Sequence, residues 1–298
     1  MSSDAPTGPS APAPTPGSRP HGAVGMVRTA SRRVVSVEPF FMEFIAGAEE
    51  VLAVHDLSVL LAVVADEDAE RHTYARWAES DIVDAVMVVN VREDDDRPAL
   101  LAAHGIPSVM VGRWDGEPSL PAVRADDVAA MEEAAGYLLG LDHRTLAHVT
   151  GPRAYLHTQA RVRALAAACA PYGVEPVTVE GDYSDDAGER ITRELLDRTP
   201  RPTAIVYDND VMAVAGLHVA HELGVSVPGE LSLLGWDDSR LCRLTQPPLS
   251  TMSLDVHEMG RLVGIAVLET IEGRPPVHDA VITARIVVRG STAAPAST

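Results

Sequence analysis

The chain contains no lysine. All 24 of its basic residues are arginines, they face 43 acidic residues, and the formal net charge is −19. Without lysine, a protein cannot form a lysine Schiff base or complete a P-loop, in which a lysine contacts the nucleotide phosphates. The acidic balance also disfavours an exposed nucleic-acid-binding face, because such a face needs clustered cations. These absences exclude two large enzyme classes and count against DNA binding.

Cysteines, aromatic residues and long apolar runs are also scarce. Cys169 and Cys242 form no CxxC pair, and we expect both to be buried, reduced thiols. Aromatic residues make up 4% of the chain, so alanine, valine and leucine must fill most of the core. No apolar run approaches the ~18–20 residues that span a bilayer. Residues 1–21 show no leader pattern, and their Pro/Ala/Ser/Thr-rich composition predicts a disordered tail. We therefore expect a cytoplasmic protein that does not bind membranes.

From Ala23 onward, short apolar runs alternate with helical patterns. A length of 298 residues is long for one core and suits two α/β lobes. Near-continuous apolar strands between amphipathic helices are typical of parallel sheets covered on both faces. Strands are predicted at 24–29, 57–63, 85–90, 108–112, 146–150, 176–180, 204–207 and 231–235. Helices are predicted at 39–54, 68–80, 97–104, 126–141, 157–172, 186–198, 210–223 and 255–271.

Residues that tolerate a left-handed backbone mark several predicted helix ends. Gly105 and Gly224 each stand between a helix and the next strand. Asp142 occupies a third such position, and aspartate tolerates that conformation better than most residues. Residues 291–298 are again rich in Ala, Pro, Ser and Thr, which predicts a second disordered tail.

Short motifs follow one another in a distinctive order. They are Glu38-Pro39-Phe40-Phe41 with Gly47, Gly105-Ile106-Pro107, Asp142-His143-Arg144, Arg161, Gly181-Asp182-Tyr183, Asn209-Asp210-x-Met212-Ala213, Gly224-x-x-Val227-Pro228, Gly235-Trp236-Asp237-Asp238 and Pro247-Pro248-Leu249-Ser250-Thr251. Over residues 22–290 this ordered set resembles the effector-binding domain of LacI/GalR-family transcriptional regulators.

The resemblance implies an α/β, periplasmic-binding-protein-like fold of type I. Such a fold has two Rossmann-like lobes with parallel sheets, a ligand cleft between them, and three crossovers, here expected near residues 125, 253 and 282. On that template the N-terminal lobe comprises residues 22–124 plus 255–281. The C-terminal lobe comprises residues 126–252 plus 282–290.

The resemblance does not extend to a DNA-reading segment. Family repressors begin with a helix-turn-helix, whereas the residues before Ala23 predict no recognition helix. We therefore expect this chain not to bind operator DNA by itself. A stand-alone sensor, a subunit that pairs with an intact paralogue and a misassigned start all remain open. Extra residues between Val27 and Glu38, including Arg32 and Arg33, predict a longer loop at the mouth of the cleft.

The family's binding positions fall at the carboxyl ends of strands, where ligands of open α/β sheets bind. Arg161 occupies the family's ligand-contacting arginine position, and its planar fork suits hydroxyl or carboxylate oxygens. Asp237 matches the family's acceptor for ligand hydroxyls, and Asn209 can both donate and accept. The alternatives are a surface salt bridge for Arg161 and a turn cap for Asp237. Asp210 is predicted to cap the following helix.

Aromatic residues complete the expected site. We expect one of Phe40 and Phe41 to lie in the core and the other against the ligand. Tyr183 resembles the family aromatic that covers the opposite side, and Arg113 follows a short strand as a candidate cation for ligand oxygens. The predicted ligand-binding residues are thus Phe40, Phe41, Arg113, Arg161, Tyr183, Asn209 and Asp237.

Three positions depart from the family pattern. Glu38 replaces the usual asparagine, Gly112 stands where sugar binders often have aspartate, and Leu254 stands where glutamine is frequent. These changes alter the set of hydrogen bonds and count against a standard hexose or pentose. Glu38 is expected either to pair with an arginine or to face a cationic or hydroxyl-rich effector.

The leading interpretation is a homodimeric effector sensor that binds a small polar, sugar-like ligand and needs no cofactor. The alternative is a solute-binding protein of a transport system, which would need an export leader or a lipid-anchoring cysteine. Catalysis is disfavoured, because no nucleophile–base set accompanies the paired acids Asp208/Asp210 and Asp237/Asp238. His218 and His221 share a helix face without a convincing further metal ligand. The acidic run 93–96 predicts a solvated loop.

Overall fold

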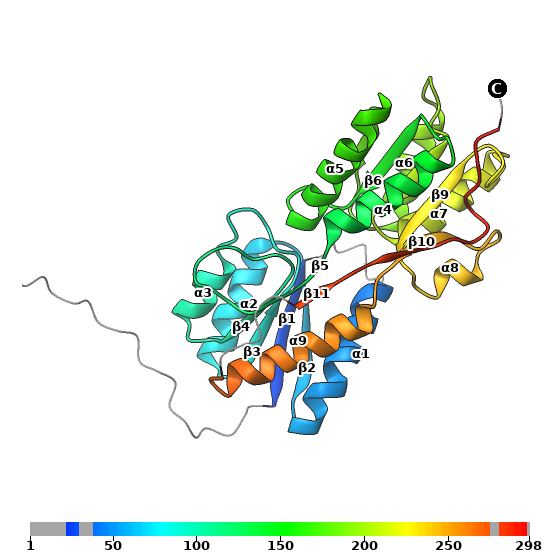
Figure 1. Ribbon diagram of the computed structural model, residues 1–298. Coiled ribbons are helices and arrows are strands. Elements are labelled where there is room, and N and C mark those ends of the chain that lie inside the picture. Colours follow the sequence, from blue (N-terminus) through cyan, green and yellow to red (C-terminus); the bar gives the residue numbers. More distant parts are fainter. Residues whose placement is uncertain (1–21, 30–37, 275–279, 297–298) are drawn as a thin grey trace, which may run out of the picture.

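Two six-stranded sheets form the framework of this computed structural model, which describes residues 22–29, 38–274 and 280–296 (Figure 1). The first sheet has the order β11-β5-β4-β3-β1-β2, with β1 Ala23–Thr29, β2 Ser58–Val64, β3 Ala85–Val88, β4 Ser108–Val111, β5 Ala122–Ala125 and β11 Ala280–Ile282. The second has the order β12-β10-β9-β8-β6-β7, with β6 Leu146–Thr150, β7 Val177–Glu180, β8 Ala204–Tyr207, β9 Ser232–Asp237, β10 Ser250–Ser253 and β12 Arg285–Val287.

Neighbouring strands run parallel, except for the antiparallel pair of β10 and β12. The chain passes between the lobes after β5, after β10 and after β11. These crossovers lie where the sequence predicts them, and the predicted fold class of two parallel-sheet lobes is confirmed.

Helices cover both faces of each sheet, as the apolar strands require. In the first lobe, α1 and α9 pack side by side on one face, and α2 and α3 cover the other (Figure 1). In the second lobe, α6 and α7 pack together, and α4 and α5 form the opposite layer. The helices are α1 Pro39–Leu52, α2 Glu67–Glu79, α3 Arg97–Ala103, α4 Asp127–Gly140, α5 Leu156–Cys169, α6 Asp185–Leu196, α7 Asp210–Glu222, α8 Leu241–Leu244 and α9 Val256–Ile271, with single 3₁₀ turns at Ala53–His55 and Ala170–Tyr172.

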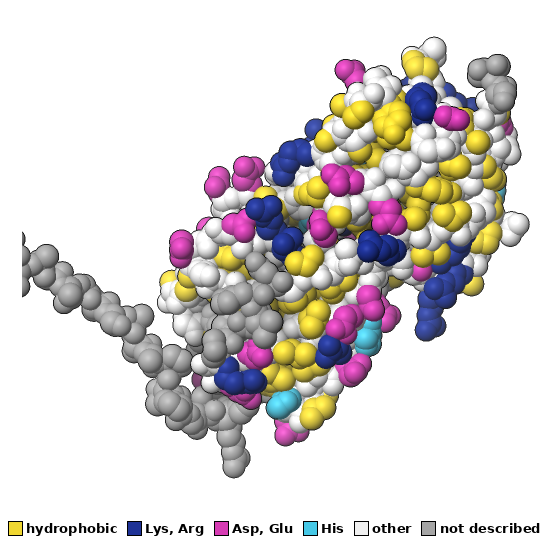
Figure 2. Space-filling view, in the orientation of Figure 1, with side chains coloured by type: hydrophobic (Ala, Val, Ile, Leu, Met, Phe, Trp, Pro, Cys, Tyr) yellow, Lys and Arg dark blue, Asp and Glu magenta, His cyan; other side chains and the backbone are white. Residues whose placement is uncertain are grey.

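Side-chain caps and close contacts fix these helices. Asp66, Asp126, Ser184 and Asp255 each accept a hydrogen bond from a first-turn backbone N–H. Helices α1 and α9 approach closely through Gly260, where a Cβ atom would lie 2.0 Å from the Phe44 carbonyl oxygen. Figure 2 shows charged side chains gathered along the outer surface of this pair, where His257 lies between Glu43 and Glu50.

The predictions for the helix ends and for the two cysteines are confirmed. Gly105, Gly224 and Asp142 have φ values of 71°, 70° and 70°. Cys169 and Cys242 are both buried, free thiols. Among the described residues, none of the helices combines the length and apolar character needed to cross a membrane.

The prediction of a disordered tail is wrong for the first residues after 290. Ser291 is fully buried; its backbone oxygen accepts the Leu233 N–H at 2.8 Å, and its hydroxyl donates to the Leu233 oxygen. Thr292 contacts the hydroxyls of Tyr137 and Ser250. The small polar side chains that suggested disorder instead hydrogen-bond this segment along β9. The predicted tails at 1–21 and 297–298 and the extra loop at 30–37 lie outside the described residues.

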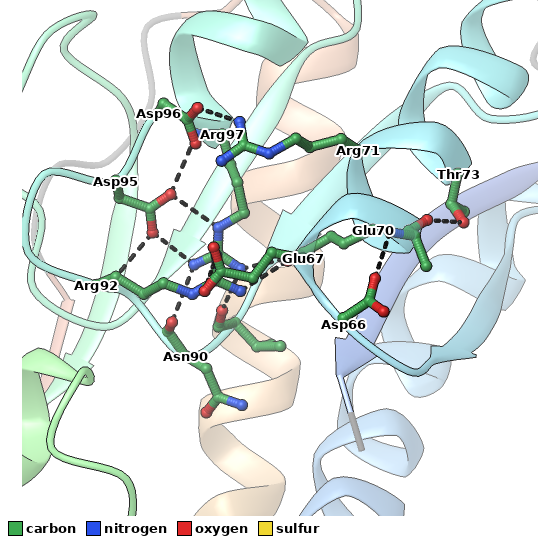
Figure 3. A network of polar contacts seen from close by, with 12 residues as sticks. Asp66, Glu67, Glu70, Arg71, Thr73, Asn90, Arg92, Asp95, Asp96 and Arg97 are labelled. Atoms are coloured by element: carbon green, nitrogen blue, oxygen red, sulfur yellow. Dashed lines mark hydrogen bonds and ion pairs between the residues drawn. The ribbon is translucent and has the colours of Figure 1, made fainter. Parts of the chain in front are cut away.

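The acidic run 93–96 is not simply a solvated loop (Figure 3). Asp95 is buried and accepts two hydrogen bonds from the Arg97 guanidinium, at 2.8 and 2.5 Å. Arg97 also donates to Glu70 at 3.0 Å, and Arg92 donates to the other Glu70 oxygen at 2.7 Å. The prediction is right for Glu93, Asp94 and Asp96, which are exposed, and wrong for Asp95. Asp95 can be buried because Arg97, at the start of the following helix, forms an ion pair with it.

Candidate functional site

A pocket of about 240 Å³ lies between the two lobes. Strands β1, β4, β5 and β9 contribute their last residues to its lining, and β3, β7 and β8 end within two residues of it. Because parallel strands of one sheet end at the same edge, the two sheets together direct their carboxyl ends at this space. Of the seven predicted site residues, Phe40, Phe41, Arg161, Tyr183, Asn209 and Asp237 line it.

Arg161 lies on α5 and is buried against the second lobe. Its Nε donates to Asp127 at 2.8 Å, and its Nη1 lies 3.3 Å from the Asp208 backbone oxygen. The guanidinium carbon lies 4.1 Å from the centre of the Trp236 ring. These contacts hold the guanidinium plane in one orientation, and its Nη2 has no hydrogen-bond partner among the described residues. The salt bridge predicted as an alternative is present, but it lies in the pocket wall and not on the outer surface.

Asp208 forms an ion pair with Arg161 in the wall of the pocket. Its carboxylate accepts hydrogen bonds from His148 Nε2 and from the Gly151 N–H, both at 2.9 Å, and lies 3.4 Å from Arg161 Nη1. Burial raises the pKa of Asp208, but the contacts with His148 and Arg161 outweigh it and hold this pKa below its usual range. Asp208 is therefore ionised and keeps the charge on Arg161 balanced.

The predicted role of Asp210 as a helix cap is wrong. Asn209 is the cap residue: its Oδ1 accepts the Met212 N–H at 2.9 Å, and its Nδ2 donates to the Tyr183 oxygen at 3.0 Å. Asp210 instead points toward β9 and β10, where it accepts from the Ser239 N–H and the Thr251 hydroxyl. One residue earlier in the chain, Asn209 has the extended backbone that a cap needs.

Asp237 ends β9 with a φ of 100° and lines the pocket. Burial, with the Asp210 carboxyl nearby, raises the pKa of Asp237 well above its usual range. The pKa of Asp210 is also raised by burial. Two buried carboxyl groups this close favour holding a proton between them. Asp237 accepts no hydrogen bond from the described residues and can accept one from a ligand.

Aromatic rings form two walls. Phe41 is buried, as the core member of its pair, whereas Phe40 is partly exposed; both line the pocket. On the opposite lobe, the Tyr183 hydroxyl lies 2.7 Å from His157 Nε2. Tyr183 has a φ of 68°, and its ring occupies the space where a Cβ on Gly151 would lie, 2.0 Å from the ring. Burial and the Arg161 charge lower the pKa of His157 to about 4, so its ring is neutral near pH 7.

Glu38 pairs with an arginine, as one of its two predicted alternatives states. Its Oε1 lies 2.8 Å from Arg28 Nη2, and Arg28 also lies over the Phe41 ring at 4.9 Å. Burial raises the pKa of Glu38 to about 7, although Arg28 opposes the change. Both residues of the pair line the pocket from the first lobe.

Arg113 does not reach the pocket. Its side chain is 71% exposed and pairs with Asp115 at 2.5 Å, while its neighbour Gly112 lines the pocket with a φ of 136°. The left-handed turn at Gly112 directs the chain outward immediately before Arg113. The sequence also left Arg28, His157 and Asp127 unassigned. Asp127 could have been predicted, because it directly follows the first crossover and therefore lies where the two lobes meet.

Comparison with known proteins agrees with this geometry. A family profile described as a periplasmic binding protein-like domain matches residues 135–292. The HTH-type transcriptional repressor CytR of Escherichia coli K12 is 28% identical over 261 residues, covering 86% of this chain and 76% of that protein.

Two solved structures are also similar. A LacI family transcriptional regulator from Bifidobacterium animalis subsp. lactis has a TM-score of 0.82 and 31% identity, covering 93% of this chain and 100% of that one. A complex of the transcriptional regulator CelR with cellobiose has a TM-score of 0.83 and 26% identity, covering 92% and 85%.

Proposed function

Because the chain belongs to the LacI family of transcriptional regulators and forms its periplasmic-binding-protein-like effector domain, we propose that the interlobe pocket binds a small polar, sugar-like effector. The observation that carries the proposal is that Arg161, whose Nη2 has no hydrogen-bond partner among the described residues, and Asp237 line one pocket. A fixed donor and a free acceptor in one pocket suit the hydroxyl groups of a polyol. The related CelR structure holds cellobiose, which supports this ligand class.

Binding would stabilise the closed arrangement of the lobes. The lobes touch beside the pocket. There the Leu156 N–H donates to the Val91 oxygen at 2.9 Å, and the backbones of Arg92 and Tyr155 pair in an isolated antiparallel β-bridge. A ligand held between Phe40 of one lobe and Arg161 of the other adds contacts that only the closed state makes. Its binding free energy would therefore shift the population toward closure.

Calorimetry and X-ray scattering test the proposal together. Titrating the chain with a panel of mono- and disaccharides, polyols and nucleosides should identify a ligand that binds with one site per chain. The same ligand should reduce the radius of gyration of the protein. If no compound of the panel binds in the pocket at concentrations up to about 50 mM, well above the millimolar limit of weak specific binding, the ligand class is wrong.

We also propose a side-by-side homodimer. Apolar side chains are exposed on α1 and on the edge strand β2, namely Met42 (52%), Leu60 (37%) and Val63 (58%). An exposed apolar strand edge favours a partner, and symmetric dimers are the commonest oligomers. Sedimentation equilibrium should give about twice the chain mass of 31.6 kDa, and Leu60→Asp with Val63→Asp should give the monomer. A wild-type mass near 31.6 kDa at micromolar concentration would refute the dimer.

The two lobes are not expected to bind operator DNA themselves. On the face in Figure 2, arginines are interspersed with acidic side chains, and acids outnumber bases 43 to 24 over the chain. Phosphate binding needs several clustered cations. A titration of the chain with its own promoter region near 100 mM salt should show no sequence-dependent binding tighter than about 1 μM. Saturable, specific binding below that value would contradict the expectation.

We place the protein in the cytoplasm, where cell fractionation should recover it.

A further inference from the structure

Carboxyl groups outnumber cations around the pocket. Six line it, Glu38 from the first lobe and five aspartates from the second, against the two guanidinium groups of Arg28 and Arg161. Arg28 already pairs with Glu38, and Arg161 already pairs with Asp127 and Asp208. His157 adds no charge near pH 7, because its pKa is about 4. The protein therefore leaves part of the negative charge in its pocket without a counter-charge.

The carboxyl groups without an ion pair belong to the second lobe. Asp182, Asp210 and Asp237 make no ion pair with any cation of the described residues; Asp182 accepts from Ser184, and Asp210 accepts from Ser239 and Thr251. Glu38 of the first lobe lines the same pocket; the charge of Asp182 raises the pKa of Glu38, and the charge of Glu38 raises the pKa of Asp237. Asp182 is exposed, so water screens its charge, whereas Asp210 is buried and Asp237 is partly buried. Like charges at these less exposed positions repel, so the pocket favours either bound protons or a cation.

The walls of the pocket suit a cation as well. Phe40 and Phe41 line one side, and Tyr155, His157 and Tyr183 line the other. Cations are attracted to the faces of such rings. The protein already makes two contacts of this kind at the pocket, Arg28 over Phe41 and Arg161 over Trp236. Aromatic faces combined with unpaired carboxyl groups favour an ammonium group over a neutral hydroxyl, because both attract a positive charge.

We propose that the effector is a polyhydroxylated compound with a protonated amino group, and that this group lies between Glu38 and Asp237 against the aromatic walls. The inference rests on the proposed function, because it names the ligand class of the same pocket. Arg161 and Asn209 would then bind the hydroxyl groups of the ligand, and the carboxyl groups would bind its ammonium.

Proton release provides a signature of this arrangement. Burial raises the pKa of Glu38, whose charged and titratable neighbours are Arg28, Asp182, Tyr183 and Asp237, to about 7. The pKa of Asp237, which faces Asp210, Arg161, Glu38 and Asp208, is raised well above its usual range. The empty pocket therefore holds protons near pH 7, and an ammonium group that needs ionised carboxylates displaces them. Affinity for the amine should rise from about pH 6 to about pH 8, whereas a neutral polyol should show no such rise.

The experiment compares matched pairs of probes by calorimetry. The pairs are D-glucitol with 1-amino-1-deoxy-D-glucitol, D-galactitol with its 1-amino analogue, and D-glucose with D-glucosamine. In at least one pair the amine should bind about tenfold or more tightly than its partner, a difference of about 1.4 kcal/mol. Titrations of the wild type in buffers of different ionisation enthalpy should show proton release, a result that depends on no variant.

Variants locate the ammonium group. Glu38→Gln and Asp237→Asn should each reduce the preference for the amine to about threefold or less. The matched control is Glu43→Gln, which removes the same charge from an exposed position of α1 outside the pocket, and it should keep the full preference. An equal loss in the control would overturn the inference, because it would show only the effect of net charge.

Other outcomes separate the inference from the proposed function. If the neutral member of each pair binds as tightly as the amine or more tightly, and Arg161→Ala weakens that binding, the inference of an ammonium group is wrong. The proposal of a sugar-like effector is then still supported. If none of the probes binds at about 50 mM, the inference of an ammonium group is also wrong, because the pocket then has no millimolar affinity for an ammonium polyol. Binding of the broader saccharide and nucleoside panel then decides the proposed function separately.

Discussion

Replacing Arg97 by methionine should lower the free energy of unfolding by about 3–5 kcal/mol, the usual cost of removing one partner from a buried ion pair. The Arg97 side chain is 3% exposed and donates to Asp95, Glu70 and the backbone oxygens of Val89 and Asn90 (Figure 3). Methionine fills similar space but leaves Asp95 without its guanidinium partner. Urea denaturation followed by circular dichroism measures the change.

Arg71→Met provides the matched control for this prediction. Arg71 belongs to the same network, but it pairs with Asp96 at an exposed position, where the two side chains are 41% and 53% exposed. Water and salt screen such a pair, so we expect no measurable change in the urea midpoint. Equal losses for the two arginines would show that burial does not set the strength of this network, and the prediction for Arg97 would be wrong.

The sequence predicts the fold well because each long element carries its own periodicity. The eight predicted strands and eight predicted helices correspond to elements with closely similar bounds. The strands absent from that prediction are β5, β10, β11 and β12, which have three or four residues each. Length alone does not explain this, because β3, β4, β7 and β8 have four residues each and were predicted. Polar residues interrupt the apolar runs of β5, β10 and β12, and pairing with neighbours distant in sequence stabilises them. The helix α8, with four residues, is too short to show a helical period.

Side-chain surroundings were harder to predict than backbone elements. Asp95 was predicted to be solvated with the rest of its acidic run, although Arg97, its ion-pair partner, lies only two residues later. Ser291 was predicted to be disordered because its partner, Leu233, lies 58 residues earlier. In both cases the direction of a side chain decides burial, and a local pattern of polar residues does not show that direction.

Within the pocket, position along the fold was predictable and orientation was not. Residues at strand ends, such as Asn209 and Asp237, lie where the sequence places them. Arg113 also follows a strand, yet the backbone turn at Gly112 directs it to solvent. Glu38 was recognised from the sequence as unusual, but its partner was not. The partner, Arg28, lies near the end of β1, whereas Glu38 is the residue before α1. Ligand binding by these residues stays a prediction.

Arg161→Ala should weaken effector binding about 30-fold or more, because truncating one member of a buried, hydrogen-bonded charge pair costs about 2 kcal/mol or more. The substitution removes the guanidinium group from the pocket lining, and it leaves the carboxylates of Asp127 and Asp208 without their shared cation. The first effect acts on the hydroxyl contacts of the ligand, so the loss is measured with a neutral ligand, which gains nothing from the carboxylates left unpaired. Calorimetry with the ligand from the panel measures the loss.

Arg163→Ala separates this effect from a general change in charge or in the helix. Arg163 lies on α5 two residues later, is exposed and contacts only Gln159 at 3.3 Å among the described residues. It carries the same charge on the same helix but points away from the pocket, so its removal should leave the affinity unchanged. Because Arg161 also fixes Asp208 and packs on Trp236, a thermal melt of each variant must accompany the titration. A folded Arg161→Ala variant that binds as tightly as the wild type would remove Arg161 from the binding site and, with it, the main support for a hydroxyl-binding pocket.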